Sequence, residues 1–263
     1  MPFANNDGVR VHYEVEGDGP PLMLVHGRGW SMQDWVRAGY PAALRDEFRV
    51  VLVDCRGFGE SDKPHTSDAY GQEQYMSDMC AVLDALSIDR THYWGYSMGG
   101  KLGWALAVNR PDRLRSVVIG EYPALTDRQS DEDVYRWNAQ SLVLAQGMEV
   151  YVAALEMTQG RLPEYQRNRL LAQDPIAYSC QQLGNLRWGA SDDQVRAITT
   201  PMFIYTGADR VEGSFSNVRR TKESAAMVRS ARYMQFDVKG HEPTFEACEV
   251  VTPHVRAFLR EVG

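Results

Sequence analysis

The chain has 263 residues, 44% of them hydrophobic and 24% charged, which is the composition of a globular protein with a sizeable core. The formal net charge is −7 and no basic run is longer than Arg219-Arg220, so a nucleic-acid partner is disfavoured, because phosphates require clustered Lys and Arg. No segment approaches the roughly 18 consecutive apolar residues of a membrane span, and residues 1–8 lack the pattern of a signal peptide.

Cysteine usage indicates a reducing compartment. The cysteines, Cys55, Cys80, Cys180 and Cys248, are scattered without any C-x-x-C pair. This spacing favours reduced thiols over disulfides or a zinc site. We therefore expect a cytoplasmic protein that holds no metal.

The first half of the chain alternates strand patterns with helix patterns. Short continuous apolar runs predict strands buried on both faces, and apolar residues at helical spacing follow them. The predicted strands cover residues 9–15, which we expect at a sheet edge, and 22–25, 49–54, 91–96 and 114–119. The predicted helices cover residues 35–44, 70–86 and 101–107.

The alternation stops after Glu121 and resumes near residue 197. Residues 122–196 carry helical patterns only, with many aromatic and methionine residues. Beyond them we predict strands at 202–205 and 232–236, a helix at 218–228, and a last helix at 244–259 that Pro253 should bend or split.

Repeated strand-helix alternation predicts a mainly parallel sheet with helices on both faces. Residues 1–121 and 197–263 would form this core, and residues 122–196 would be a helical cap inserted over the carboxyl ends of the strands. Ligands of such sheets bind at those strand ends.

The most specific signal is Gly95-Tyr96-Ser97-Met98-Gly99-Gly100, between a predicted strand and a predicted helix. A G-x-S-x-G sequence in this context is typical of a nucleophile elbow. A serine on such a strained turn needs neighbours without Cβ atoms, because strand and helix backbones approach closely there. Ser97 is therefore the candidate nucleophile.

Three further motifs accompany the elbow, and together the four resemble those of the α/β-hydrolase fold family over essentially the whole chain. They are His26-Gly27, Asp54-x-Arg56-Gly57-x-Gly59-x-Ser61-Asp62-x-Pro64, and Gly240-His241. The resemblance implies a mostly parallel sheet of the eight-stranded type with an inserted helical cap. It also implies a catalytic triad in the chain order nucleophile, acid, histidine, and a role for His26 in bracing its loop.

His241 is the candidate base, because it alone follows a glycine in the loop directly after the last predicted strand. A serine hydroxyl is a weak nucleophile at neutral pH and needs a base within hydrogen-bond reach. The other histidines fall within predicted strands, in the last helix or in loops that favour structural or surface roles.

Asp209 is the preferred candidate for the acid. The family's usual position after the strand that follows the cap favours Asp209, although Asp209 lies only two residues past Gly207, where many relatives have a spacing of three. Glu121, directly after the strand at 114–119, is the rival, and Glu212 is a weaker third candidate.

The resemblance implies an oxyanion hole made of the backbone amides of Arg28 and Met98. The Arg28 side chain could reach a substrate carbonyl or carboxylate, or form only a surface salt bridge. Trp30, Trp137 and Trp188 are candidates for the wall of a substrate pocket, although aromatic residues at such spacing are more often simple core.

These features predict a serine hydrolase that cleaves a small carboxylic ester or lactone through an acyl-enzyme. Perhydrolase activity and carbon–carbon bond hydrolysis use the same triad, and a non-catalytic small-molecule receptor of the same fold is a third alternative. Dehalogenase- and epoxide-hydrolase-like relatives carry an aspartate where Ser97 stands, which disfavours those reactions. The G-x-G-x-x-G pattern fails after both Gly27 and Gly57, so no cofactor is expected.

Overall fold

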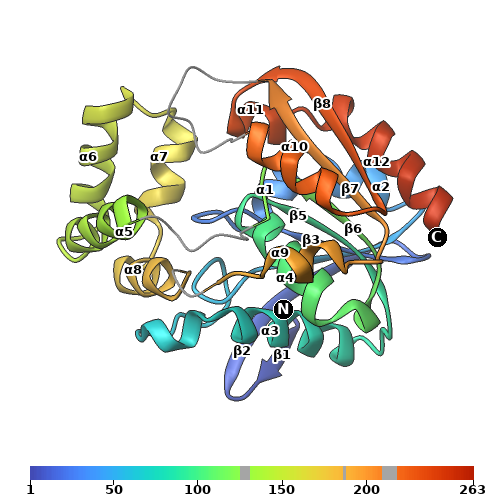
Figure 1. Ribbon diagram of the computed structural model, residues 1–263. Helices are drawn as coiled ribbons and strands as arrows, with labels where there is room; N and C mark the ends of the chain where they lie inside the picture. The colour runs from blue at the N-terminus through green and yellow to red at the C-terminus, as the bar shows by residue number, and fades with distance from the viewer. Residues whose placement is uncertain (125–130, 186–187, 209–217) are drawn as a thin grey trace.

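The computed structural model describes residues 1–124, 131–185, 188–208 and 218–263 (Figure 1). Its strands are β1 (Phe3–Asn6), β2 (Val9–Glu16), β3 (Pro21–Val25), β4 (Arg49–Val53), β5 (Thr91–Tyr96), β6 (Leu114–Gly120), β7 (Met202–Ala208) and β8 (Ala231–Lys239). Within the described residues, these eight strands form one sheet in the order β1-β2-β4-β3-β5-β6-β7-β8. The predicted mostly parallel, eight-stranded architecture is therefore confirmed.

The sheet is parallel from β4 to β8, while β1 and β2 are antiparallel to their neighbours. The prediction that residues 9–15 form an edge strand is wrong, because β2 pairs with both β1 and β4. Asp7 and Gly8, with φ of 49° and 87°, make the tight turn that folds β1 back onto β2. A two-residue Asp-Gly connection is a strong hairpin signal.

Helices cover both faces of the sheet (Figure 1). The core helices are α1 (Met32–Arg37), α2 (Tyr40–Leu44), α3 (Gln72–Ala85), α4 (Met98–Asn109), α10 (Val218–Met227), α11 (His241–Glu246) and α12 (Cys248–Val262), with short 3₁₀ turns η1 (Ser67–Tyr70) and η2 (Pro111–Arg113). Two hydrophobic clusters result, one on each face of the sheet.

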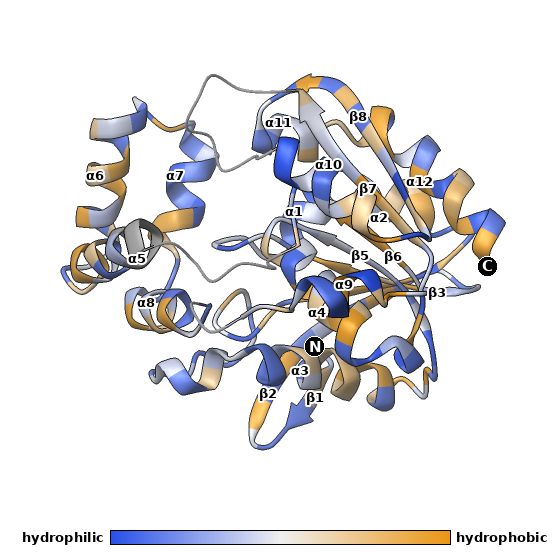
Figure 2. Ribbon diagram, in the orientation of Figure 1, coloured by the Kyte–Doolittle hydropathy of each residue, from blue (hydrophilic) through white to orange (hydrophobic). Residues whose placement is uncertain are grey.

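Alternate residues of one strand enter opposite clusters, as the two-residue period of a strand requires. In β3, Met23 and Val25 belong to the cluster with α3 and α4, whereas Leu22 and Leu24 belong to the cluster with α1, α2 and α12. Figure 2 shows the matching division in α12, whose hydrophobic residues alternate with hydrophilic ones along the helix. Burial on both faces explains why these strands read as continuous apolar runs in the sequence.

Two predicted helices are each divided in the structure. The helix predicted at 35–44 is two helices, α1 and α2, because Gly39 between them has a left-handed φ of 88°. The last predicted helix is interrupted at Ala247, between α11 and α12, and not at Pro253, which lies inside α12. Gly39 and Ala247 therefore set the breaks in these two helical stretches.

The described residues between β6 and β7 contain helices and no strand. They are α5 (Asp131–Leu144), α6 (Met148–Gln159), α7 (Glu164–Leu171), α8 (Pro175–Gly184) and α9 (Asp192–Arg196). In Figure 1, α5 to α8 stand together on one side of the sheet, whereas α9 lies against the core. We call α5 to α8 the cap.

Among the described residues, no helix combines the length and the apolar character that a membrane crossing would need.

Candidate active site

Ser97 occupies the sharp turn between β5 and α4. Its backbone is left-handed, with φ of 54° and ψ of −112°, a conformation that costs a non-glycine residue free energy and persists only where its surroundings hold it. A Cβ on Gly95 would lie 2.0 Å from the carbonyl oxygen of Gly99, and one on Gly99 would lie 2.2 Å from that of Val25. The two glycines are therefore a steric requirement of this turn.

The loop after β3 is fixed by His26, which is fully buried. Its Nδ1 lies 2.7 Å from the carbonyl oxygen of Gly27, and its Nε2 accepts the backbone N–H of Cys55 at 3.0 Å. This arrangement requires the proton on Nδ1, and burial lowers the pKa of His26, so the ring is neutral. The braced loop brings Gly27 against Ser97, since a Cβ on Gly27 would lie 3.4 Å from the Ser97 Cβ.

Two backbone amides next to Ser97 have no hydrogen-bond partner among the described residues. They belong to Met98, the first residue of α4, and to Arg28, which follows Gly27. The neighbouring amides are satisfied: Ser97 N–H donates to Gly120 at 2.9 Å, and Gly99 N–H donates to His26 at 3.1 Å. Free N–H groups at a helix start and in an adjacent loop suit the binding of a negative oxygen.

His241 is the first residue of α11 and follows Gly240, whose φ is 113°. The hydroxyl of Tyr96, the residue before Ser97, donates to the His241 carbonyl oxygen, and the two rings lie with centroids 5.1 Å apart. No hydrogen bond joins the Ser97 hydroxyl to His241 within the part of the chain that the structure describes. Such bonds are often long in ligand-free enzymes and tighten when substrate binds.

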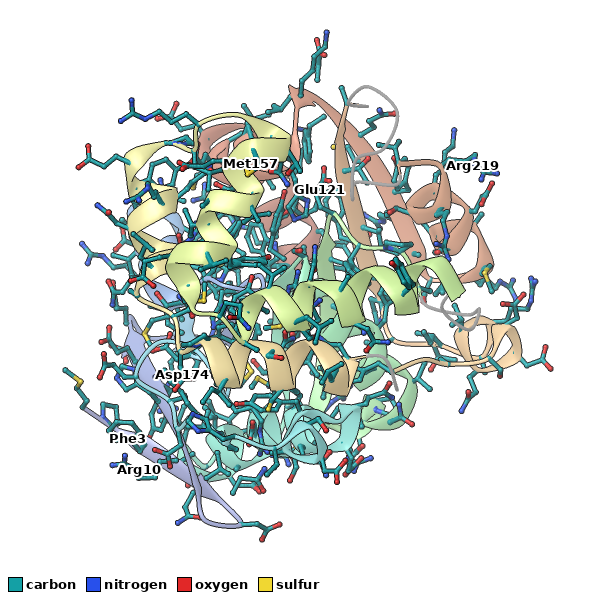
Figure 3. The ribbon with its side chains drawn as sticks, turned by 90° about the vertical axis from the view of Figure 1, so that its left-hand side faces the viewer. Phe3, Arg10, Glu121, Met157, Asp174 and Arg219 are labelled. Atoms are coloured by element: carbon teal, nitrogen blue, oxygen red, sulfur yellow. The ribbon has the colours of Figure 1, made fainter. Side chains whose placement is uncertain are left out.

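Glu121 is the carboxylate that the structure brings to His241. It follows β6 directly, is 2% exposed and has a left-handed φ of 58°. Its Oε2 lies 3.4 Å from His241 Nδ1, and its Oε1 accepts the backbone N–H of Gly207 in β7. Figure 3, which views the molecule from the cap side, labels this residue. Asp209 and Glu212 lie outside the described residues.

The three tryptophans singled out in the sequence have different surroundings. Trp30 is buried, with its ring stacked on Tyr96 at a centroid distance of 5.7 Å. Trp137, on α5, is half-buried and lies under the Arg28 guanidinium. Trp188 is buried against Tyr75, and its Nε1 donates to the Tyr70 carbonyl at 3.1 Å. Trp30 thus contacts Tyr96 and Trp137 contacts Arg28, both near Ser97. Trp188 packs against Tyr75 in the core.

The Arg28 side chain points toward the cap. Its Nη1 donates to Oε1 of Gln182 at 2.7 Å, and its guanidinium lies 5.2 Å from the ring centre of Tyr178, both residues of α8. No carboxylate within the described residues forms an ion pair with it. The Arg28 side chain therefore does not form the surface salt bridge that was one of its two expected roles.

Lys101, on α4 one turn after Ser97, is a site neighbour that the sequence analysis missed. It is 5% exposed, its Nζ donates to the carbonyl oxygen of Asn185 at 2.9 Å, and its ammonium lies 4.7 Å from the ring centre of Trp188. Burial lowers its pKa well below the usual value, and the nearby Arg28 charge acts in the same direction. The sequence signal that could have indicated Lys101 is a charged residue within an otherwise mostly apolar predicted helix.

The remaining histidines have other partners. His12 Nδ1 lies 2.9 Å from Asp54 Oδ2, and His92 Nδ1 lies 2.8 Å from Ser116 Oγ, both inside the sheet. His65 contacts Asp174 at the start of α8 at 2.9 Å. Within the described ranges, no group of three or more His, Cys, Asp or Glu side chains is arranged to hold a metal ion.

Comparison with known proteins agrees with the observed fold. A family model described as the alpha/beta hydrolase fold matches residues 20–148. The enol-lactonase from Burkholderia xenovorans LB400 superimposes with a TM-score of 0.83 at 24% identity, over 98% of this chain and 100% of that one. A thermophilic esterase from Thermogutta terrifontis superimposes with a TM-score of 0.84 at 25% identity, over 99% and 98% of the two chains. The chain therefore has the alpha/beta hydrolase fold.

A curated relative extends the comparison in sequence. A Bacillus subtilis (strain 168) protein, provisionally named as a 2-succinyl-6-hydroxy-2,4-cyclohexadiene-1-carboxylate synthase, is 30% identical over 189 residues, which are 69% of this chain and 65% of the relative. The chain spans less than two thirds of the length of the first curated relatives that it matches, down to 20%. Shorter matches to a bifunctional epoxide hydrolase of Sus scrofa and a haloalkane dehalogenase of Mycobacterium tuberculosis show that its relatives differ in activity.

Proposed function

We propose that the protein is a serine hydrolase that cleaves a carboxylic ester or lactone through an acyl-enzyme. The observation that carries the proposal is the left-handed Ser97 between β5 and α4, at the same sheet edge as a histidine that contacts a buried carboxylate. In this arrangement Glu121 Oε2 lies 3.4 Å from His241 Nδ1. A nucleophile, a base and a third group that orients the base are the elements of a catalytic triad.

The mechanism assigns each group one step. His241 Nε2 takes the proton of the Ser97 hydroxyl while Ser97 Oγ attacks the carbonyl carbon. The amides of Arg28 and Met98 stabilise the resulting oxyanion. His241 then gives the proton to the departing alkoxide, and the alcohol leaves or, in a lactone, stays attached through the acyl chain. A water molecule repeats the same steps to release the acid and restore Ser97.

We assign the acid of this triad to Glu121. Its Oε1 is held by the Gly207 amide, which leaves Oε2 free to face the imidazole. A carboxylate on Nδ1 keeps the proton there, so that Nε2 is unprotonated and able to act as the base. With Glu121 as the acid, the nucleophile, the base and the acid of the proposed triad all lie within the described residues.

The named activities of the relatives also support an ester or lactone substrate. The two superimposed structures are an enol-lactonase and an esterase. A serine at position 97 supports an acyl-enzyme, because an ester of that serine is the intermediate that water then hydrolyses.

The first test is intact-mass analysis after treatment with a small fluorophosphonate, which phosphonylates a serine activated by a working base. We expect a single adduct on the wild type and none on Ser97→Ala, together with loss of model-ester hydrolysis in that variant. Ser87→Ala is a matched control, because Ser87 is also left-handed, with φ of 54°, but is exposed and lies at the end of α3. An unlabelled, well-folded wild type would contradict the proposal and favour a binding protein.

A further inference from the structure

Two cations near Ser97 reach toward the cap and have no acidic partner among the described residues. Arg28 follows the glycine that touches Ser97, and Lys101 N–H donates to the Ser97 carbonyl oxygen at 2.9 Å at the start of α4. The Arg28 side chain reaches Gln182 on α8, and the Lys101 side chain reaches Asn185 just after α8. Both charges therefore face the same end of one cap helix.

Two other cations of low exposure, Arg56 and Arg169, are paired with carboxylates. Arg56 is 3% exposed, and its Nε lies 2.6 Å from Oδ2 of Asp78. Arg169 on α7 bonds Asp34 at 2.9 Å and Glu242 at 2.8 Å. Among the described residues, Arg28 and Lys101 differ from these arginines in having only neutral partners.

Leaving two like charges unpaired costs free energy, because the buried Lys101 and the half-buried Arg28 lose hydration and repel each other. The two side chains reach Gln182 and Asn185, three residues apart at the end of α8. Burial lowers the pKa of Lys101, and the Arg28 charge acts in the same direction. Amide carbonyls and aromatic rings compensate only in part. An anion placed between the two cations would remove both penalties at once.

The Lys101 side chain lines a small, mostly apolar pocket beside α4. Trp104, Pro123 and Trp188 are among the other lining residues, whereas Arg28 and Ser97 are not. Among the described residues, the buried side-chain oxygens of Gln181 and Asn185, at the end of α8, have no hydrogen-bond partner. Both oxygens are acceptors, so a water molecule or a donor group on a ligand would satisfy them, whereas a carboxylate would not.

We propose that Arg28 and Lys101 bind a carboxylate carried by the substrate, away from the bond that is cleaved. The substrate class is thus an ester or lactone with a free carboxylate, whose hydrolysis yields a dicarboxylate. This inference rests on the proposed function for the identity of the bond that is cleaved. Binding of the carboxylate does not require Ser97 to react. Arg28 takes part twice, through its amide at the oxyanion and through its guanidinium at the carboxylate.

The kinetic test compares two 4-nitrophenyl esters that differ only at the far end of a glutaryl chain, in a carboxylate or a carboxamide. Charge-assisted hydrogen bonds exceed neutral ones, so we expect wild-type kcat/KM to favour the carboxylate ester by about 10-fold or more. Arg28→Met and Lys101→Met should each reduce that ratio to within about threefold of unity, mainly through KM. Lys101→Arg keeps the charge and should retain most of the preference.

Lys63→Met is the control, because Lys63 is half-buried like Arg28 and, among the described residues, donates to backbone carbonyls, those of Gly59 and Ser61. Its preference ratio should equal that of the wild type. A wild-type ratio near unity, or an equal loss toward both esters in the Arg28 and Lys101 variants, would overturn the carboxylate site.

Binding to Ser97→Ala separates this inference from the proposed function. By calorimetry, we expect glutarate to bind this variant, glutaramide not to bind, and glutarate binding to be lost when Arg28→Met is added. If glutarate binds but the wild type cleaves neither ester, the proposed hydrolase function is refuted and the proposed anion site is retained. Ser97-dependent cleavage with no glutarate binding and no charge preference would refute the anion site alone.

Discussion

Ser97 and Glu121 are non-glycine residues in left-handed backbone conformation that end two neighbouring parallel strands, β5 and β6. Their φ values are 54° and 58°. Holding an L-residue in this region costs about 1–2 kcal/mol, and such strain gathers at functional sites where surrounding contacts enforce it. The shared geometry turns both side chains out of the sheet at the edge where His241 begins α11.

Substitution of the two acid candidates tests the assignment of Glu121. We expect Glu121→Gln to lower kcat by about 10⁴-fold, the loss found when a triad acid of a serine protease is neutralised, because the amide favours the wrong imidazole tautomer. Asp209→Asn should retain most of the activity. The measurement is steady-state hydrolysis of a 4-nitrophenyl ester by both variants.

Circular dichroism should be recorded for both proteins, because Glu121 also holds the Gly207 amide and its loss could disturb β7. The reverse pattern, with a folded and active Glu121→Gln and an inactive Asp209→Asn, would transfer the role to Asp209.

At the scale of elements, ion pairs fasten the cap helix α7 to the core. Arg169 of α7 bridges Asp34 of α1 and Glu242 of α11, and its guanidinium lies 5.0 Å from the ring centre of Trp30. Its side chain is only 14% exposed, so solvent screens these ion pairs weakly. Since Glu242 adjoins His241, the contact also fixes the start of the helix that carries the proposed base.

Removing this bridge should loosen the cap. We expect Arg169→Met to lower the free energy of unfolding by about 2 kcal/mol, because Asp34 is left buried with only the distant end of Arg37 as a cation. Hydrogen exchange measured by mass spectrometry should show faster exchange in α7 and in α11.

Arg167→Met provides the control on the same helix. Arg167 is 46% exposed and its nearest contact to Glu156 is 3.9 Å, so its loss should change stability by less than about 0.5 kcal/mol. Equal exchange of α7 in the two variants would show that Arg169 does not fasten the cap.

At the scale of the whole molecule, the sheet buries histidines that must stay neutral. His92 in β5 is fully buried, and burial lowers its pKa to about 4. Burial also lowers the pKa of His26. In the unfolded chain both would titrate near their ordinary pKa of about 6.5.

Stability should therefore fall in mild acid. Between pH 6.5 and about 4, His92 binds a proton in the unfolded chain but stays unprotonated in the native protein. The free energy of unfolding therefore decreases as the pH falls through this window. We expect His92 to account for about 2 kcal/mol of the loss, measured by urea denaturation at pH 7 and pH 4.5.

His92→Asn, which keeps a polar group near Ser116, should flatten this dependence. His254→Asn should not, because His254 is exposed on α12. A pH dependence that is the same in the wild type and His92→Asn would contradict the role given to His92.

Much of this architecture could be predicted from the sequence, because local rules determine it. Continuous apolar runs require strands buried on both faces, and strand-helix alternation requires parallel pairing. Gly95 and Gly99 allow the turn at Ser97 through contacts of 2.0 and 2.2 Å with nearby backbone. The hairpin at Asp7-Gly8 and the break at Gly39 are equally local, and the sequence analysis missed them although a turn signal was present in each.

The partners of side chains were decided only by the tertiary structure. Glu121 meets His241 across 120 residues of chain, and Arg28 meets Gln182 across 154. No sequence pattern shows that Arg28 and Lys101 lack an acidic partner, since that depends on which surfaces the cap covers. Local sterics act between near neighbours and can be read from a motif, whereas pairing and burial depend on how distant elements pack, and there only the folded chain decides.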